Sequence, residues 1–530
     1  MRQGVDERIT ELPPQPMTNR ELWRWRVEQT PDRRWLWHDA RAWSYAEFDL
    51  EVRRLAAGLA ATGIGPGTRV LVGMTNRPET VAVHLALIQV GAVCVPLVPG
   101  MPLVELIHPI RNSEAAILVA TDPIASAVLE HPEDVASIER IVVLGEVSAE
   151  SSAEVERYED LLSGEPLEHK PLDGQDDQTL THVVYTSGST GKPKGVMLKA
   201  GSFYASGLGY ADRYAITGDD TYLLATPLAH SLGAIAALGI AMVTSGAVAL
   251  VERFRPSTFW SQVEASGVTV SVLFATHLNL LLETDTGDPA AGQSSLRFVV
   301  THIDHPGFRE RFGVEMATIW GMTETLVCAG SDPGYAGELG PGYIGYAWPG
   351  AELGIFDKES FQRLGPGHHG ELCLRHPQVM LGYLNDHEAT GSTLVDGWVR
   401  SGDRAIMDHS GRTYFAGRYK SMIKRSGENV SAEEVEAALA AHRDVAECVV
   451  FGVPDRLRSE EVAAVVVQRA GARLEPGGLR ESCAQQLVRW KLPRYIAVQE
   501  EPLPRLPTGK VDRVLVLAAF DLTAAWDAES

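Results

Sequence analysis

Residues 185–196 read Tyr185-Thr-Ser-Gly-Ser-Thr-Gly-Lys-Pro-Lys-Gly-Val196, and they follow an apolar run, residues 182–185, that is typical of a short buried strand. The segment combines three glycines, four hydroxyl groups and two lysines. Glycine lets backbone N–H groups approach a phosphate without interference from a Cβ atom, hydroxyls donate further hydrogen bonds, and lysine adds a compact positive charge. The segment therefore predicts a loop that binds a polyphosphate.

The loop differs from a Walker A loop, which needs a glycine five residues before its Gly-Lys pair and Ser or Thr after the lysine. Thr186 and Pro193 hold those two places. Because Pro193 has no N–H and a fixed φ, a helix is not expected to begin there. A surface Gly/Ser linker is the alternative, but such a linker rarely follows a buried strand.

The loop resembles the signature loop of the adenylate-forming superfamily, which contains acyl-CoA synthetases, adenylation domains of peptide synthetases and beetle luciferases. The resemblance implies ATP as the phosphate ligand. The residues implied to bind it are Thr186, Ser187, Gly188, Ser189, Thr190, Gly191 and Lys194.

Length and composition describe a soluble globular protein. The 530 residues are too many for one ordinary core, and 45% are apolar while 22% are charged. The net charge of −22 argues against binding of nucleic acid. Residues 1–17 lack the apolar core of a signal peptide, and the uncharged residues 232–251 are interrupted by Thr244-Ser-Gly246, which favours a buried helix and a strand over a membrane span. We expect a cytoplasmic protein.

The cysteines are scattered along the chain, odd in number and without a C-x-x-C pair. This pattern predicts neither a disulfide framework nor a zinc site, and it fits a reducing compartment. They are Cys94, Cys328, Cys373, Cys448 and Cys483.

Helices and strands alternate from residue 20 to about residue 121, and again after the loop. Ser44 and Glu47 form a capping box for a helix that runs to Ala61, and Pro78 opens the next helix. This alternation predicts an α/β fold with two wound sheets covered by helices. The predicted strands are residues 69–73, 115–119, 140–144, 247–251, 268–273 and 296–300.

The pattern changes twice in the second half of the chain. Short strands and glycine turns over residues 340–416 predict a small antiparallel barrel. A capping box at Ser431–Glu434 then opens a helix to about His442, and the last 110 or so residues suffice for a small α+β domain. We expect an N-terminal adenylation domain of residues 1–418 and a C-terminal domain of residues 419–530, which the resemblance implies to be mobile.

A second motif, Trp320-Gly-Met-Thr-Glu324, resembles the aromatic-Gly-x-Thr-Glu motif of the superfamily. The resemblance implies that Trp320 packs on adenine, that the Thr323 hydroxyl reaches the α-phosphate, and that Glu324 binds Mg²⁺, a hard ion that prefers oxygen ligands. A tryptophan by itself is more often a core residue, so the motif gains its weight from the loop.

Two further motifs resemble the nucleotide contacts of the superfamily. Asp403, in Ser401-Gly-Asp403, is implied to accept hydrogen bonds from the ribose hydroxyls, and Arg418 is implied to lie near the ribose and phosphate. Lys510, in Pro507-Thr-Gly-Lys510, is implied to stabilise the charge that develops between the acid and the α-phosphate. Lys420 occupies the hinge position, where many synthetases have aspartate.

Two segments leave their roles open. His230, in Pro227-Leu-Ala-His230, is implied to shape the acyl pocket, and a packed core histidine is an equal alternative. The segment Val300-Thr-His-Ile-Asp-His-Pro306 replaces the usual glycine-alanine-proline stretch near adenine, so Thr301–Asp304 are atypical. His302, Asp304 and His305 would suit a metal site, although packing or loop exposure is the favoured interpretation.

The resemblance implies that the protein converts a carboxylic acid and Mg·ATP to an acyl-adenylate and pyrophosphate, and that a thiol then takes the acyl group. Coenzyme A is the predicted thiol, because residues 379–386 and 425–430 look like those of carnitine/crotonobetaine-type and medium-chain ligases. A carrier protein or an amine remains an alternative acceptor, and a homodimer is compatible. Gly233, Ala234, Trp320 and Met322 suggest a medium-sized apolar or aryl acid.

Overall fold

The computed structural model describes residues 12–530 with the exception of residues 15, 148–154, 171, 187–191, 285–288, 290–292, 303–305, 333–341, 420–421, 470, 505–510 and 512. The chain divides into two compact units. The larger comprises Met1–Thr186, Lys194–Leu273 and Leu281–Gly417, and the smaller comprises Ser187–Pro193, Phe274–Leu280 and Arg418–Ser530.

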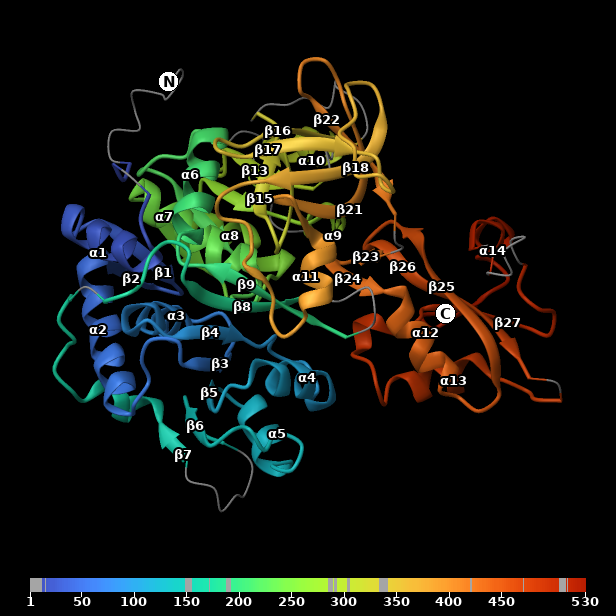
Figure 1. The fold of residues 1–530 in the computed structure, drawn as a ribbon, viewed down its shortest axis with the longest axis horizontal. Coiled ribbons are helices and arrows are strands. Elements are labelled where there is room, and N and C mark those ends of the chain that lie inside the picture. Colours follow the sequence, from blue (N-terminus) through green and yellow to red (C-terminus); the bar gives the residue numbers. More distant parts are fainter. Residues whose placement is uncertain are drawn as a thin grey trace. The chain divides into compact units, whose positions relative to one another are not determined.

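The first sheet of the larger unit has the strand order β19-β9-β8-β4-β3-β5-β6-β7 (Figure 1). The strands from β8 to β7 along this order run parallel, and β9 and β19 are antiparallel additions at one edge. The strands are β3 (Arg69–Gly73), β4 (Val93–Pro96), β5 (Ile117–Ala120), β6 (Arg140–Val143), β7 (Val155–Arg157), β8 (Leu180–Thr186), β9 (Lys194–Lys199) and β19 (Gly382–Tyr383).

Two helices around this sheet begin where the sequence predicts. Ser44 caps the first of them, since Glu47 N donates to Ser44 Oγ at 3.2 Å and Ser44 N donates to the Glu47 carboxylate at 2.8 Å. Pro78 is the first residue of the next. The helices of this region are α2 (Tyr45–Ala61), α3 (Pro78–Val90), α4 (Leu103–Ser113), α5 (Ile124–Glu130) and the 3₁₀ helix η1 (Tyr158–Leu162).

The second sheet has fourteen strands, of which β17-β18-β21-β22-β16-β15-β14-β13-β12-β10-β11-β1-β2 form the continuous order and β20 pairs with β21. Its parallel strands are β1 (Arg34–His38), β10 (Thr221–Leu224), β11 (Ala247–Leu250), β12 (Val270–Val272), β13 (Phe298–Thr301) and β14 (Glu315–Met322), with β2 (Arg41–Ser44) antiparallel at the edge. The helices of this region are α1 (Asn19–Gln29), α6 (Ser202–Tyr214), α7 (Leu238–Thr244), α8 (Pro256–Ser266), α9 (Ala275–Glu283), α10 (Pro306–Phe312) and α11 (His387–Thr393).

The segment predicted to be antiparallel extends this second sheet. Its strands follow an open order within the described part of the chain, where the sequence analysis expects a small barrel. They are β15 (Leu326–Gly330), β16 (Tyr343–Ala347), β17 (Glu352–Phe356), β18 (His369–Arg375), β20 (Leu394–Val395), β21 (Trp398–Met407) and β22 (Thr413–Arg418).

The uncharged residues 232–251 form a buried π-helical turn, η2 (Leu232–Ala237), then α7 and β11, as the sequence predicts. Glycines allow α7 to pack closely on α6, because a Cβ atom on Gly207 would lie 2.2 Å from the carbonyl oxygen of Gly239. Among the residues that the structure places, no helix is long and apolar enough to cross a membrane.

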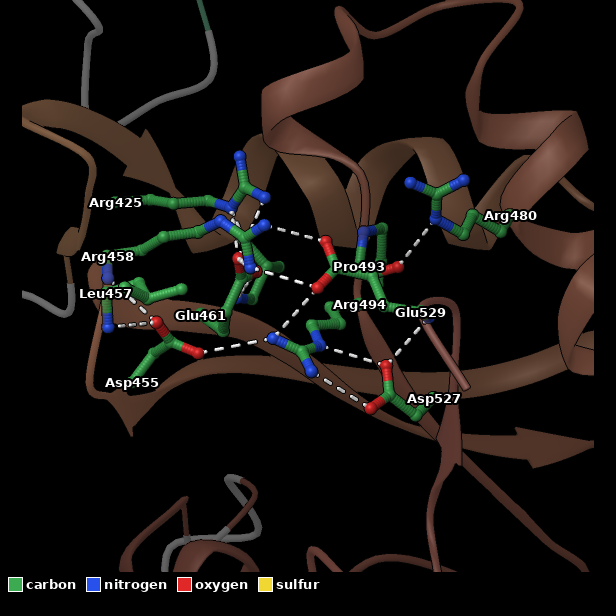
Figure 2. Close-up of polar contacts among 11 residues, drawn as sticks. Arg425, Asp455, Leu457, Arg458, Glu461, Arg480, Pro493, Arg494, Asp527 and Glu529 are labelled. Atoms are coloured by element: carbon green, nitrogen blue, oxygen red, sulfur yellow. Dashed lines mark hydrogen bonds and ion pairs between the residues drawn. The ribbon is translucent and has the colours of Figure 1, made fainter. Parts of the chain in front are cut away.

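The smaller unit contains a six-stranded sheet in the order β24-β23-β26-β27-β28, with β25 paired to β26. Arginine side chains connect the C-terminal residues to these strands. The guanidinium group of Arg494, for example, donates to the Asp527 carboxylate at 2.9 and 3.0 Å (Figure 2). Its elements are β23 (Met422–Arg425), β24 (Glu428–Ser431), α12 (Ala432–Ala440), β25 (Val445–Asp455), β26 (Ser459–Gln468), α13 (Pro476–Cys483), the 3₁₀ helix η3 (Arg489–Lys491), β27 (Tyr495–Gln499), α14 (Arg513–Ala519) and β28 (Trp526–Asp527). The α/β class, with a large N-terminal region of wound sheets and a smaller α+β region, is confirmed.

Candidate active site

The phosphate loop connects two antiparallel strands. Thr186 at the end of β8 is paired with Lys194 at the start of β9, so the two ends of the loop lie side by side. Residues 187–191 of the loop lie outside the described residues. The strand that begins at Lys194 confirms that no helix follows Pro193, and it distinguishes the loop from the strand–loop–helix arrangement of a P-loop.

Lys194 connects the loop to the Thr323-Glu324 motif through a tyrosine. The Nζ atom of Lys194 lies 4.9 Å from the ring centroid of Tyr383, and the Tyr383 hydroxyl donates to Glu324 Oε1 at 2.7 Å. Tyr383 reaches this place because β19 pairs with β9, with Tyr383 opposite Val196. Burial and the nearby Glu324 carboxylate raise the pKa of Tyr383, so its hydroxyl keeps its proton and remains a donor.

Trp320 and Asp403 meet directly, although the sequence predicts separate contacts with adenine and ribose. The indole Nε1 of Trp320 donates to Asp403 Oδ2 at 2.9 Å, and both side chains are buried. Trp320 belongs to a core cluster with residues of β16, β17, β18 and β21, so only 6% of its surface is accessible. This position supports a role in holding Asp403 more than a broad stacking surface for adenine.

The segment of β21 that carries Asp403 is fixed by hydrogen bonds within the strand and to the neighbouring β18. Asp403 N donates to Ser401 Oγ at 3.0 Å, and Gly402 N donates to Glu371 Oε1 at 3.0 Å. Gly402 has a φ of +71°, a conformation that favours glycine. Arg400 in turn holds Glu371 through its guanidinium group. The Asp403 backbone is therefore positioned before any ligand binds.

Thr323 lies next to the loop that carries His230. Its Oγ1 is 3.4 Å from Ser231 Oγ, within hydrogen-bonding distance. His230 Nδ1 accepts from Leu232 N at 3.2 Å, which assigns the proton of the neutral ring to Nε2. His230 is exposed, so it is not enclosed in the core. These contacts favour a position at the site over the alternative of a packed core histidine.

Asn76 holds the backbone of this loop. Its Nδ2 donates to Thr226 O at 2.9 Å and to Val251 O at 3.2 Å, and its Oδ1 accepts from Leu228 N at 2.8 Å. Gly233 packs on the same loop, because a Cβ atom there would lie 2.3 Å from Pro227 O. Gly233 therefore makes a close backbone contact and Ala234 is fully buried, while their place in an acyl pocket stays a prediction.

Several predicted residues lie outside the described part of the chain. These are Ser187–Gly191, Lys420, Asp304, His305 and Lys510, together with the side chain of Arg418 at the end of β22. Their predicted roles stay predictions. His302 is described: it is exposed, and its Nδ1 donates to Ile319 O of β14 at 3.1 Å, which supports loop exposure over a metal site.

The sequence analysis missed Tyr383, Ser231 and Asn76. Tyr383 lies within residues 379–386, which carry part of the resemblance to CoA ligases, so a signal for it was present. Nothing in the spacing of Asn76 or Ser231 indicates their contacts, because each depends on how distant strands are brought together.

The chain matches two family models in succession. The model described as AMP-binding enzyme covers residues 23–384. The chain belongs to this family. The model of the AMP-binding enzyme C-terminal domain covers residues 434–510 of the same enzyme. The predicted resemblance to the adenylate-forming superfamily is confirmed.

Relatives with known names support this class. A crotonobetaine/carnitine–CoA ligase of Escherichia coli is 30% identical to this AMP-binding enzyme over 89% of the chain and 92% of the relative. The o-succinylbenzoate CoA synthetase of Bacillus subtilis, solved with a product analogue, has a TM-score of 0.81 at 25% identity and covers 95% and 98% of the two chains. An amide bond synthetase of Marinactinospora thermotolerans has a TM-score of 0.82 at 28% identity and covers 95% and 100%.

Proposed function

We propose that this enzyme joins a small carboxylic acid to coenzyme A in two steps, with Mg·ATP as the energy source. The observation that carries the proposal is the connection between Lys194 at the phosphate loop, Tyr383 and the buried Glu324. It brings a phosphate-binding loop and an oxygen ligand suited to a divalent cation into one site. The relatives named CoA ligase or CoA synthetase support coenzyme A as the acceptor.

In the first step, a carboxylate oxygen of the acid attacks the α-phosphorus of ATP, and the bond from that phosphorus to the bridging oxygen breaks. Pyrophosphate leaves and an acyl-adenylate remains. The Thr323 hydroxyl is our candidate donor to the α-phosphate, and Lys510 our candidate cation for the transition state. Lys510→Ala should lose most adenylation and still convert added acyl-adenylate to product.

Glu324 fits a magnesium ligand because it is a buried carboxylate held in place by a tyrosine hydroxyl. Mg²⁺, when bound, supplies positive charge to the phosphates of ATP. Asp403 is our candidate acceptor for the ribose hydroxyls, and the Trp320 indole fixes its orientation. Arg418 is assigned to the same nucleotide.

In the second step, the thiolate of coenzyme A attacks the acyl carbonyl carbon, and AMP leaves with the electrons of the broken anhydride bond. The neutral His230 borders Thr323 through Ser231, so we place the acyl group beside it. A small acid with a polar or apolar body is compatible with this position. The thiol of a carrier protein is the alternative acceptor.

A second candidate function follows from the amide bond synthetase, which covers nearly all of this chain at a similar TM-score. In that function an amine attacks the acyl-adenylate, and an amide forms. The first step and its residues are shared, so the two candidates differ only in the acceptor.

The deciding experiment measures pyrophosphate release and product mass for a panel of carboxylic acids, each with coenzyme A, with a primary amine, or with neither. Acid-dependent pyrophosphate release with a thioester product supports the proposal. An amide in the amine reaction, without thioester in the coenzyme A reaction, would establish the second candidate. No acid-dependent pyrophosphate release would overturn both.

A further inference from the structure

Two histidines and a cysteine meet in the interior of the first sheet, away from the residues assigned to ATP. His84 lies on α3, Cys94 on β4 and His182 on β8, and all three are fully buried. Cys94 and His182 are opposite each other in the parallel pairing of β4 with β8. Gly91, with a φ of +74°, ends α3 and turns the chain directly into β4, which places His84 beside Cys94.

The spacing of the three side chains fits a metal ion with nitrogen and sulfur ligands. One candidate ligand atom from each residue lies within 4.8 Å of those of the other two. Cys94 Sγ is 3.6 Å from His84 Nδ1. Tetrahedral zinc, with bonds of about 2.3 Å to sulfur and about 2.0–2.1 Å to nitrogen, separates these two atoms by about 3.6 Å.

The environment of the His182 ring is the second observation that points to a ligand. Within the described part of the chain, neither of its ring nitrogens meets a hydrogen-bond partner, although the side chain is fully buried. A neutral imidazole carries one donor and one acceptor, and both normally find partners in a protein interior. Its neighbours include the Phe203 ring, at 5.8 Å between centroids, and the His84 ring, at 5.6 Å.

We propose that His84, Cys94 and His182 bind one zinc ion inside the first sheet. As the sulfur–zinc bond forms, the Cys94 thiol releases its proton to solvent, and each imidazole contributes the lone pair of one nitrogen. Thiolate and imidazole ligands together suit zinc better than hard cations such as Mg²⁺. The spacing of the cysteines along the chain gives no sign of this site, because it has a single cysteine and its third ligand, His182, is distant in sequence.

The site would tie α3 to the strand that leads into the phosphate loop. His182 stands on β8 four residues before Thr186, where the loop begins. A zinc ion bound there stabilises the native fold by the ligation free energy, because the unfolded chain does not present the three ligands together.

The test uses the full chain, purified through a tag without histidines and without chelators, then supplied with zinc and desalted. Elemental analysis should give about one zinc per chain. Cys94→Ser and His182→Asn should lose most of this zinc. Cys373→Ser, which alters a buried cysteine on β18 outside the cluster, should keep it.

A cobalt spectrum keeps the test decisive if the two variants fail to fold. Cobalt(II) added to the metal-free wild type should give a thiolate-to-metal charge-transfer band, and zinc should abolish it. A wild type that retains no zinc and shows no such band overturns the proposal. So does zinc retained at full level in folded Cys94→Ser and His182→Asn, which would place the metal elsewhere.

Discussion

Two carboxylates of the candidate site in the larger unit and two carboxylates of the smaller unit are held by different kinds of donor. In the larger unit, Glu324 accepts from the Tyr383 hydroxyl and Asp403 accepts from the Trp320 indole. In the smaller unit, Glu461 accepts from Arg425 and Asp527 accepts from Arg494 (Figure 2). Hydroxyl and indole donors orient a carboxylate without cancelling its charge, whereas a guanidinium group also neutralises it.

Under the proposed function, this difference separates two carboxylates that serve a ligand from two that serve the fold. Glu461 is fully buried between Arg425 and Arg458, so its charge is committed within the protein. The hydrogen bonds of Glu324 and Asp403 fix the direction of each carboxylate at the site. Substitution of Glu461 or Asp527 should therefore reduce stability, and substitution of Glu324 or Asp403 should reduce activity.

The largest expected effect is on the stability of the smaller unit. Glu461→Gln removes the fully buried charge that the partly buried guanidinium groups of Arg425 and Arg458 share, and the free energy of unfolding should fall by about 3–5 kcal/mol. Urea denaturation followed by tryptophan fluorescence measures this change. Glu481→Gln, on the exposed face of α13, is the control and should change stability by less than about 0.5 kcal/mol. Equal stability of the two variants would show that the Glu461 carboxylate does not stabilise the smaller unit.

A nearly equal effect is expected on the chemistry of the larger unit. Glu324→Gln keeps the shape and the acceptor for Tyr383 but removes the negative charge, so acid-dependent pyrophosphate release should fall by about 10²–10³-fold. The unfolding midpoint should stay near that of the wild type. Glu388→Gln, at an exposed position of α11, should retain activity. Near-normal pyrophosphate release by folded Glu324→Gln would show that its charge is not needed.

The sequence predicts much of this fold because the relevant signals are local. Ser44 and Glu47 are three residues apart and cap α2 as expected, and Pro78 opens α3. The motifs of the site are also local, and Trp320, Thr323, Glu324 and Asp403 can each be chosen from short stretches. The comparisons confirm the fold class and the family that the sequence predicts.

The partners of these residues could not be predicted, because they depend on the strand order. Trp320 reaches Asp403 because β14 and β21 belong to the second sheet. Tyr383 reaches Glu324 because β19 pairs at the edge of the first sheet. The same applies to Asn76, whose amide holds a loop 150 residues later in the chain. Gly233 makes a close backbone contact that the sequence does not indicate, and its place in an acyl pocket stays a prediction.

A smaller effect tests the role assigned to Trp320. Trp320→Phe removes the N–H that donates to Asp403 but keeps an aromatic ring in the core cluster. A hydrogen bond to a charged group contributes about 1.5–3 kcal/mol, so kcat/KM for ATP should fall by about tenfold or more. If Asp403 holds the ribose, the variant should also lose part of its preference for ATP over 2′-deoxy-ATP. A uniform loss with both nucleotides would indicate a packing role for the indole and not an orienting one.

The smallest expected effect concerns acid stability. The guanidinium group of Arg494 lowers the pKa of Asp527 by its hydrogen bonds, so this carboxylate binds a proton less readily in the folded than in the unfolded chain. Its contribution to stability is therefore fully present above the unfolded pKa of about 3.9, and it is lost as the pH falls through the lower folded value. Because a quarter of the Asp527 side chain is exposed, the pair should contribute less than about 1 kcal/mol.

Asp527→Asn should be less stable than the wild type at pH 7 by that small amount, and the two unfolding curves should converge as the pH falls below about 4. Added salt should narrow the difference at pH 7, since the pair is partly screened. Glu324→Gln is the contrasting variant, because removal of a carboxylate held by a tyrosine hydroxyl should not reproduce this salt-sensitive loss. A difference between Asp527→Asn and the wild type that widens in acid would contradict the sign of the argument, and it would place the stabilising charge on another carboxylate of the arginine network.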